Sequence, residues 1–213
     1  MNFFKIFIVF NQLNDFYGKE SLEEMTYYIK EALFSHSGKY SIKDHNLKVC
    51  FETCEQLAPF SHSISLKDNN GKELISLMRL RGIALPEYKI LHSHSEIALV
   101  KKSFKDSKSL SISCIHGTFN IKGDYYSSSY TIVDDAENIL ASIKSPCDPF
   151  IISKVFHGAT VLKKNAMEDP VPTSDCQEKV YSIDILDNEF REILIGLSII
   201  IEDLKSLNMN SII

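Results

Sequence analysis

Histidines and cysteines are the first side chains of this sequence to consider for chemistry or metal binding. His92 and His94 lie two residues apart at a predicted bend, so in a strand they share one face and could grip a metal ion. No third ligand is close in sequence, and histidines in turns are commonly solvated polar residues. Cys114 and His116 have the same spacing, but a nucleophilic cysteine also needs an oriented base and an oxyanion site. Cys114 is more simply explained as a residue of strand packing.

The sequence contains five cysteines, an odd number, and we find no secretory signal. Both features indicate reduced thiols rather than a disulfide framework. Cys50 and Cys54 share a face of a period-two strand, but they lie too far apart for easy metal chelation. No second pair of histidines or cysteines follows at zinc-finger spacing, so we predict neither a metal site nor a cofactor.

The acidic residues Asp134, Asp135 and Glu137 raise the question of calcium binding. Their spacing lacks the alternating oxygen ligands and the closing glutamate of a calcium loop. Aspartate side chains that bond nearby backbone amides in a turn explain them better. The sequence also has no glycine-rich phosphate loop, nucleophile elbow, HExxH motif or kinase signature. We therefore predict a protein that is not an enzyme.

Basic residues near two predicted strand ends form the remaining candidate site, which would bind lipid or phosphate. These residues are Arg79, Arg81, Lys101, Lys102, Lys105 and Lys108. If neighbouring strand ends bring them together, they make a positive patch that could hold lipid-headgroup phosphates by charge and hydrogen bonding. The alternative is that the lysines are solvated strand edges that guard against pairing, and Asp106 interrupts their cluster. The formal net charge of −5 argues against wholesale nucleic-acid binding.

The elements that would position these side chains are short strands joined by turns. Turn residues between period-two runs predict four hairpins, over residues 40–52, 63–79, 88–102 and 129–144. Further strand-like pieces are predicted at 109–115, 118–126 and 179–186. About ten or more antiparallel strands must close or stack, because open edges invite aggregation. At 213 residues, the chain is long enough for one sizeable core.

The segment NEFREILIGLSIIIEDLKSL at 188–207 breaks the strand pattern. Its apolar residues point in all directions around a helix, and such a helix must be buried on every side. It is too short to span a membrane, which takes about 20 apolar residues. As two strands it would need a turn at Gly196-Leu197-Ser198. Many strands and one all-apolar helix together predict a barrel with that helix inside it.

Several stretches, in this order, resemble the LURP-one-related family. They are ALFSHSGKYSIKD, SLKDNNGKELISLMR, LVKKSFKDSKSLSISC, FNIKGDYYSSSYTIVDDAENILASIK and EILIGLSIIIEDLKS. The family belongs with the tubby C-terminal domain and the phospholipid scramblases, and the third and fourth stretches look closest to plant-type members. The resemblance implies a mainly β fold, a closed antiparallel barrel of twelve strands around the hydrophobic helix at 189–205. It also implies contact with phosphoinositide or phospholipid headgroups, and a role in basal plant defence.

The resemblance predicts a single domain over residues 25–207, with a tail at 208–213. Residues 157–179 are longer than the loop usually found before the last strand, so we predict an inserted surface loop there. An alternative function is protein–protein interaction through this loop, without lipid binding.

Residues 1–24 have no counterpart in the family pattern. The apolar stretch MNFFKIFIVF carries only Lys5 and has no small-residue cleavage site after it, so it does not fit a signal peptide. We interpret this stretch as an edge strand, as an arm that packs on the domain, or as an extension upstream of Met25. No window is long and apolar enough for a transmembrane segment, and we expect a cytoplasmic protein.

Overall fold

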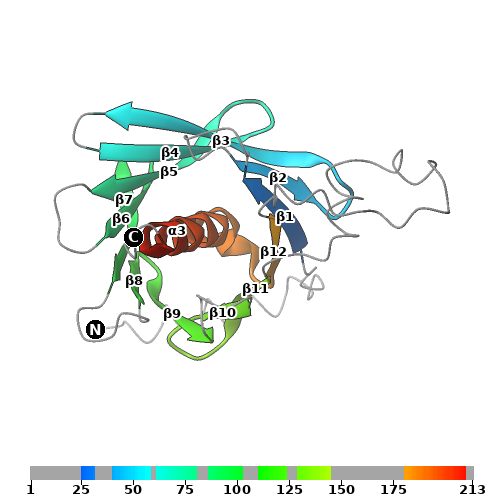
Figure 1. Cartoon of the computed structure of the whole chain (residues 1–213). Helices are drawn as coiled ribbons and strands as arrows, with labels where there is room; N and C mark the ends of the chain where they lie inside the picture. Colours follow the sequence, from blue (N-terminus) through cyan, green and yellow to red (C-terminus); the bar gives the residue numbers. More distant parts are fainter. Residues whose placement is uncertain are drawn as a thin grey trace, which may run out of the picture.

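The structure is a computed structural model of the chain, and it describes residues 25–31, 40–58, 61–80, 86–102, 110–123, 129–144 and 180–209. Twelve antiparallel strands form one closed barrel, and a helix lies inside it (Figure 1). The elements are β1 (Met25–Glu31), β2 (Tyr40–Asp44), β3 (Val49–Ala58), β4 (Ser61–Asp68), β5 (Glu73–Leu80), β6 (Glu87–His92), β7 (Ser95–Lys102), β8 (Leu110–Cys114), β9 (Gly117–Gly123), β10 (Ser129–Val133), β11 (Ile139–Lys144), β12 (Val180–Ile185), the 3-10 turn η3 (Asn188–Phe190) and α3 (Arg191–Met209). The predicted fold class is confirmed.

Each strand pairs with its neighbours in the sequence, and β1 closes the ring by pairing with both β2 and β12. Closure leaves no free sheet edge, which removes the aggregation hazard of so many strands. Strand β1 is not among the strands that the turn pattern of the sequence predicts. Tyr27 and Ile29 are buried and alternate with partly exposed residues, so the period-two pattern is present. Residues 25–31 stand outside the four predicted hairpins, and a recognisable hairpin turn is what makes most of the other strands easy to find.

Three hairpins share the same aspartate-based turn. Asp44, Asp68 and Asp134 each accept hydrogen bonds at Oδ1 from the backbone amides two and four residues later, at 2.8–3.0 Å. The residue three positions after each aspartate has a positive φ, 80° at Gly71, 67° at Leu47 and 69° at Glu137. This is the geometry of a turn closed by one left-handed residue. Asp134 therefore serves turn chemistry, as predicted.

The helix α3 fills the barrel interior, and its residues are buried all round from Leu194 to Ile201. Gly196 faces β5, where a Cβ atom would lie 2.9 Å from both Ile75 Cδ1 and Leu77 Cδ2. The glycine thus lets the helix backbone approach the strand closely. It belongs to the helix interior, and the alternative of two strands with a turn at this position is wrong.

The two ends of the barrel are built differently. At one end, which we call the turn end, the described hairpin turns connect even-numbered strands to the following odd-numbered ones. At the other end, which we call the loop end, β1, β3, β5, β7, β9 and β11 finish and α3 terminates. The connections that start and finish at the loop end lie largely outside the described residues. The predicted insertion at 157–179 falls in one of them, and the predicted extension at 1–24 is likewise outside the described residues.

Candidate functional site

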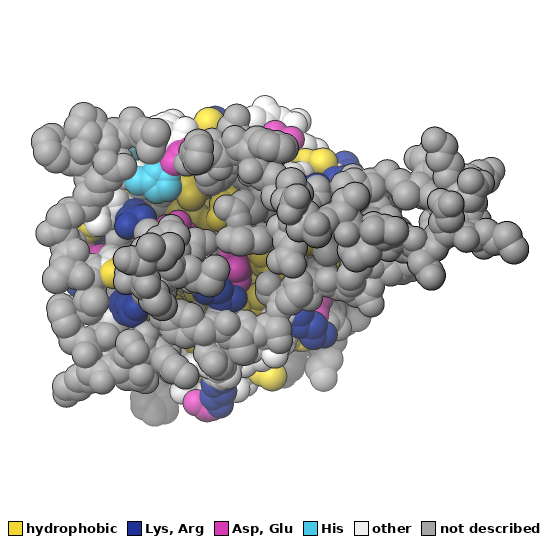
Figure 2. Space-filling view, in the orientation of Figure 1, with side chains coloured by type: hydrophobic (Ala, Val, Ile, Leu, Met, Phe, Trp, Pro, Cys, Tyr) yellow, Lys and Arg dark blue, Asp and Glu magenta, His cyan; other side chains and the backbone are white. Residues whose placement is uncertain are grey.

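The barrel interior is apolar along most of its length and becomes polar at the loop end. Strands and helix both contribute to this polar layer, which we call the polar mouth. It consists of Glu55, His62, Arg79, Tyr88, Tyr130 and Tyr181 from the strands, and Glu202, Asp203 and Lys205 from α3. On the face seen in Figure 2, acidic, basic and histidine side chains of the described residues stand beside hydrophobic ones.

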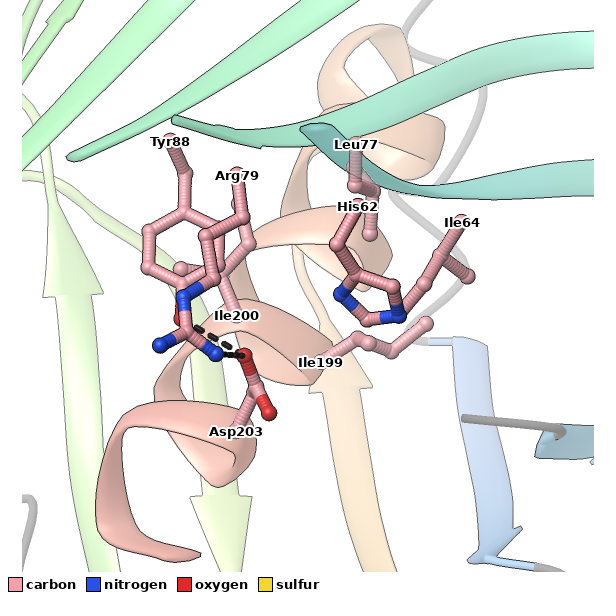
Figure 3. Close-up of a pocket in the computed structure, with 8 residues that line it drawn as sticks. All are labelled: His62, Ile64, Leu77, Arg79, Tyr88, Ile199, Ile200 and Asp203. Atoms are coloured by element: carbon pink, nitrogen blue, oxygen red, sulfur yellow. Dashed lines mark hydrogen bonds and ion pairs between the residues drawn. The ribbon is translucent and has the colours of Figure 1, made fainter. Parts of the chain in front are cut away.

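Arg79 and Tyr88 both face Asp203 of the helix (Figure 3). They are cross-strand partners in β5 and β6, and both share the inward register, because Arg79 lies two positions after Leu77 and Tyr88 lies two positions before Ile90. The Tyr88 hydroxyl donates to Asp203 Oδ2 at 2.6 Å. The Arg79 guanidinium stands 3.9 Å from the same oxygen, which is an ion pair but too long for a hydrogen bond. Burial, and then the neighbouring Asp203 carboxylate, raise the pKa of Tyr88, so its hydroxyl remains a donor.

A small cavity opens between these side chains (Figure 3). Its floor is apolar and its rim is polar. The lining residues are His62, Ile64, Leu77, Arg79, Tyr88, Ile199, Ile200 and Asp203. The space open to the centre of a water molecule is about 10 Å³, which holds about one water. The cavity therefore fits a single polar atom held by the rim.

Glu55 and His62 form a second charged contact at the mouth. They lie on adjacent strands, β3 and β4, and the His62 Nε2 atom contacts Glu55 Oε1. The Glu55 side chain is only 5% exposed, and its second oxygen has no hydrogen-bond partner in the described part of the chain. Glu55 thereby fixes the orientation of the His62 ring beside the cavity.

The opposite side of the mouth holds two buried tyrosines. The hydroxyls of Tyr130 and Tyr181 have no hydrogen-bond partner among the described residues, and burial raises the pKa of both. Lys205 Nζ lies 5.3 Å from the centre of the Tyr130 ring and 2.6 Å from Glu202 Oε1. Along the described mouth, acidic and basic side chains thus occur side by side rather than as a cationic patch.

The structure separates the predicted basic residues. Arg79 points inward to Asp203, whereas Lys101 is 52% exposed on the outer face and pairs with Glu87 at 3.3 Å. Lys102 has the inward register of Val100, at the rim. Strand β6 lies between β5 and β7, so these two strand ends are near but not adjacent. Arg81, Lys105 and Lys108 lie outside the described residues.

The other candidate residues have structural partners. His92 Nδ1 bonds to the Leu74 carbonyl at 2.8 Å, and the His116 ring packs edge-on against Phe190 at 5.2 Å between centroids. Burial raises the pKa of Cys114, which favours the thiol over the nucleophilic thiolate. Across the described ranges, no three His, Cys, Asp or Glu side chains are grouped to hold a metal ion.

Comparison with known proteins agrees with this architecture. Residues 25–202 match the LURP-one-related family. The chain belongs to this family. A search of curated proteins finds no match. Among solved structures, this LURP-one-related chain is similar to the X-ray structure of an Arabidopsis thaliana protein, with a TM-score of 0.53 and 14% sequence identity. The similarity covers 85% of this chain and 91% of the other, and it supports the fold alone.

Among the described residues, none of the helices combines the length and the hydrophobicity that crossing a membrane requires. Of the residues in the polar mouth of this LURP-one-related protein, Arg79 is predicted from the sequence, whereas its partners Tyr88 and Asp203 and the Glu55–His62 pair are not. The strand residues of the polar mouth could have been found in the sequence only by their position. Each lies near the end of a strand and has the spacing of the residues that point into the barrel. No local pattern connects Arg79 with a residue of α3, because the two are far apart in sequence.

Proposed function

We propose that this LURP-one-related protein is a non-enzymatic cytoplasmic binding module that contacts anionic phospholipid headgroups with the loop end of its barrel. One observation supports this most. In the barrel, β5 and β7 both finish at the loop end, where the long connections between strands also start. The last residues of these two strands include Arg79, Lys101 and Lys102. Loops held at one end of a rigid scaffold are a common setting for binding. In the sequence, Arg81 follows β5 by one residue, and Lys105 and Lys108 lie between β7 and β8, outside the described residues.

The charge chemistry is that of peripheral lipid binding. Each lysine near an anionic surface contributes about 1 kcal/mol of attraction, which salt screens. Because the whole protein carries a net charge of −5, attraction depends on a local orientation that presents the lysines and turns acidic surfaces away. Such binding would be weak and strongly salt-dependent. The role in basal plant defence that the family resemblance implies would then depend on recruitment to a membrane.

Vesicle sedimentation tests the proposal. The wild-type protein should sediment with phosphatidylcholine vesicles that contain phosphatidylserine or phosphoinositide, and added salt should release it. Replacing Lys101, Lys102, Lys105 and Lys108 with Ser should weaken sedimentation and reduce its dependence on salt. A control variant carries the same substitutions at Lys43, Lys48, Lys67 and Lys72, which flank two turns at the opposite end. Equal loss in both variants would assign the effect to net charge and overturn the proposal.

The second candidate function is protein–protein interaction through residues 157–179 without lipid contact. It is favoured by the position of the connection that contains them, which leaves β11 at Lys144 and enters β12 at Val180, both at the loop end. Absence of sedimentation at every lipid composition would leave this second function as the better one.

A further inference from the structure

The Arg79 guanidinium has an acidic neighbour but no hydrogen bond to it. In the part of the chain that the structure describes, its ion-pair partner is Asp203, at 3.9 Å. The Asp203 oxygen at that distance already accepts the Tyr88 hydroxyl at 2.6 Å. Arginine presents five donors in a planar fork, and this geometry matches two oxygens of a carboxylate or a phosphate. Within the described part of the chain, Arg79 is therefore balanced in charge while its guanidinium donors are not taken by a hydrogen bond.

The surroundings of Arg79 suit an oxyanion. The Arg79 side chain is 31% exposed, so a ligand can reach it from the mouth, and the apolar residues Ile64, Leu77 and Ile199 line the cavity beneath it. Few waters can approach from that side, and hydrogen bonds to charged groups are stronger where water is excluded. His62, held by Glu55, lines the same cavity as a further polar group.

We propose that Arg79, Tyr88 and His62 form a site for a phosphate ester, and that Asp203 occupies this site as an internal anion when no ligand is bound. The inference rests on the proposed function, because it names the residues that would receive a headgroup phosphate. A free phosphate offers the same chemistry and would enter the same site.

Ligand entry requires the Asp203 carboxylate to leave, because the cavity of about 10 Å³ holds only one water and is too small for a phosphate group beside it. The Asp203 side chain is 24% exposed, so rotation about its side-chain bonds carries the carboxylate into water while α3 stays in place. The phosphate oxygens then take over the Tyr88 hydroxyl and the free donors of Arg79. The displaced carboxylate remains nearby and repels the ligand, and wild-type affinity is lowered as a result.

The test is a set of charge variants titrated with inorganic phosphate, with glycerol phosphate, and with phosphatidylcholine vesicles with and without phosphatidylserine. Asp203→Asn keeps the shape and an acceptor for Tyr88 but removes the competing charge. It should bind about two- to fivefold more tightly, which corresponds to a partly exposed ion pair. Arg79→Gln should lose about tenfold or more, the equivalent of hydrogen bonds to a charged group. Arg79→Lys should recover only part of the loss, because lysine lacks the planar fork.

Glu87→Gln is the matched control. It removes one negative charge at the same end of the barrel, but on the outer face beside Lys101. In the titrations with inorganic phosphate and glycerol phosphate, where Lys101 has no proposed role, Glu87→Gln has no comparable effect if Asp203→Asn acts by freeing Arg79, and Asp203→Asn gives no gain in the Arg79→Gln background. An equal gain from Glu87→Gln, or no gain from Asp203→Asn in a protein that melts cooperatively, would overturn the inference.

The titrations with soluble phosphates and those with vesicles distinguish failure of this inference from failure of the proposed function. If wild type sediments with anionic vesicles and the Arg79 and Asp203 variants behave like wild type, lipid binding stands and the internal-anion site is wrong. If the soluble phosphates bind with the expected ranking of variants while no vesicle binds, the site stands and the membrane function fails.

Discussion

Gly196 of α3 lies against Ile75 of β5 so closely that a Cβ atom on the glycine would stand 2.9 Å from Ile75 Cδ1. Nonbonded carbon atoms prefer about 3.5–4.0 Å, so a side chain at this position must displace the strand residue. Glycine inside a helix costs about 1 kcal/mol relative to alanine. The close approach of helix and strand explains why the chain nevertheless has a glycine in the middle of its most buried element.

Replacing Gly196 with Val should destabilise the protein by about 1–3 kcal/mol, the usual cost of overpacking a core. Gly196→Ala is the control and should cost less. The Ala methyl meets the ends of the Ile75 and Leu77 side chains, which can shift, and alanine also favours the helix. Urea unfolding followed by circular dichroism measures both. A Val variant as stable as the wild type would contradict the close packing.

The strands could be predicted from the sequence because each hairpin contains its own turn chemistry. Asp68 and Gly71 stand three positions apart, and the bonds from Asp68 to Asn70 and Lys72 are local. The buried helix could be predicted because its apolar residues have no preferred face. Strand β1 was missed because it lies outside the predicted hairpins, and because its partner β12, far away in sequence, is identified by closure of the barrel.

The site could be predicted only in part. Whether Lys101 points outward and Arg79 inward is decided by the register of β5, β6 and β7, which a one-residue slip would reverse. The clustering of basic residues in the sequence does not show which of their side chains point into the barrel and which point outward. Asp203 could not be assigned to Arg79 either, because their contact requires the helix to run through the barrel with its carboxyl-terminal half at the loop end.

Replacing Leu197 with Asp should unfold the protein. Leu197 is completely buried within the barrel, and an unpaired buried carboxylate costs several kcal/mol, which rivals the stability of a whole domain. Ile115→Asp is the control, since Ile115 is 65% exposed at the turn end and should tolerate the same chemical change. Solubility and thermal melting distinguish the two. A folded, cooperative Leu197→Asp variant would show that the helix is not in the core.

Truncation after Asn188 should also abolish folding, because it removes α3 and empties the barrel. The residues lost include Leu194, Ile195 and Ile199, all without exposed surface. Gel filtration and circular dichroism test this expectation. If α3 served instead as a peripheral membrane anchor, the truncated chain would be a monomeric β-protein that melts cooperatively and no longer sediments with membranes.

The aspartate turns should lose stability in acid. The backbone amide of Lys72 donates a hydrogen bond that lowers the pKa of Asp68 in the folded protein, and the amide of Asn70 adds to the effect. The unfolded chain, with an aspartate pKa of about 3.9, then binds protons first. The stabilisation is present above that value and is lost as the pH falls through the lower folded value. Melting temperatures of wild type and Asp68→Ala should differ at neutral pH and converge in strong acid. Glu52→Ala, an exposed carboxylate on β3, is the control and should show no such convergence.

Two tyrosines of the polar mouth should respond oppositely to the loss of their hydroxyls. Tyr88 donates to Asp203, so Tyr88→Phe leaves a partly buried carboxylate without its neutral donor and should cost about 1–2 kcal/mol. The Tyr130 hydroxyl has no partner in the described structure, and Tyr130→Phe removes a buried polar group that gains nothing. That variant should be neutral or slightly more stable, because the ring that faces Lys205 is retained. Urea midpoints of the two variants provide the comparison. If Tyr88→Phe proved as stable as Tyr130→Phe, the Tyr88–Asp203 hydrogen bond would contribute nothing to holding α3 in the barrel.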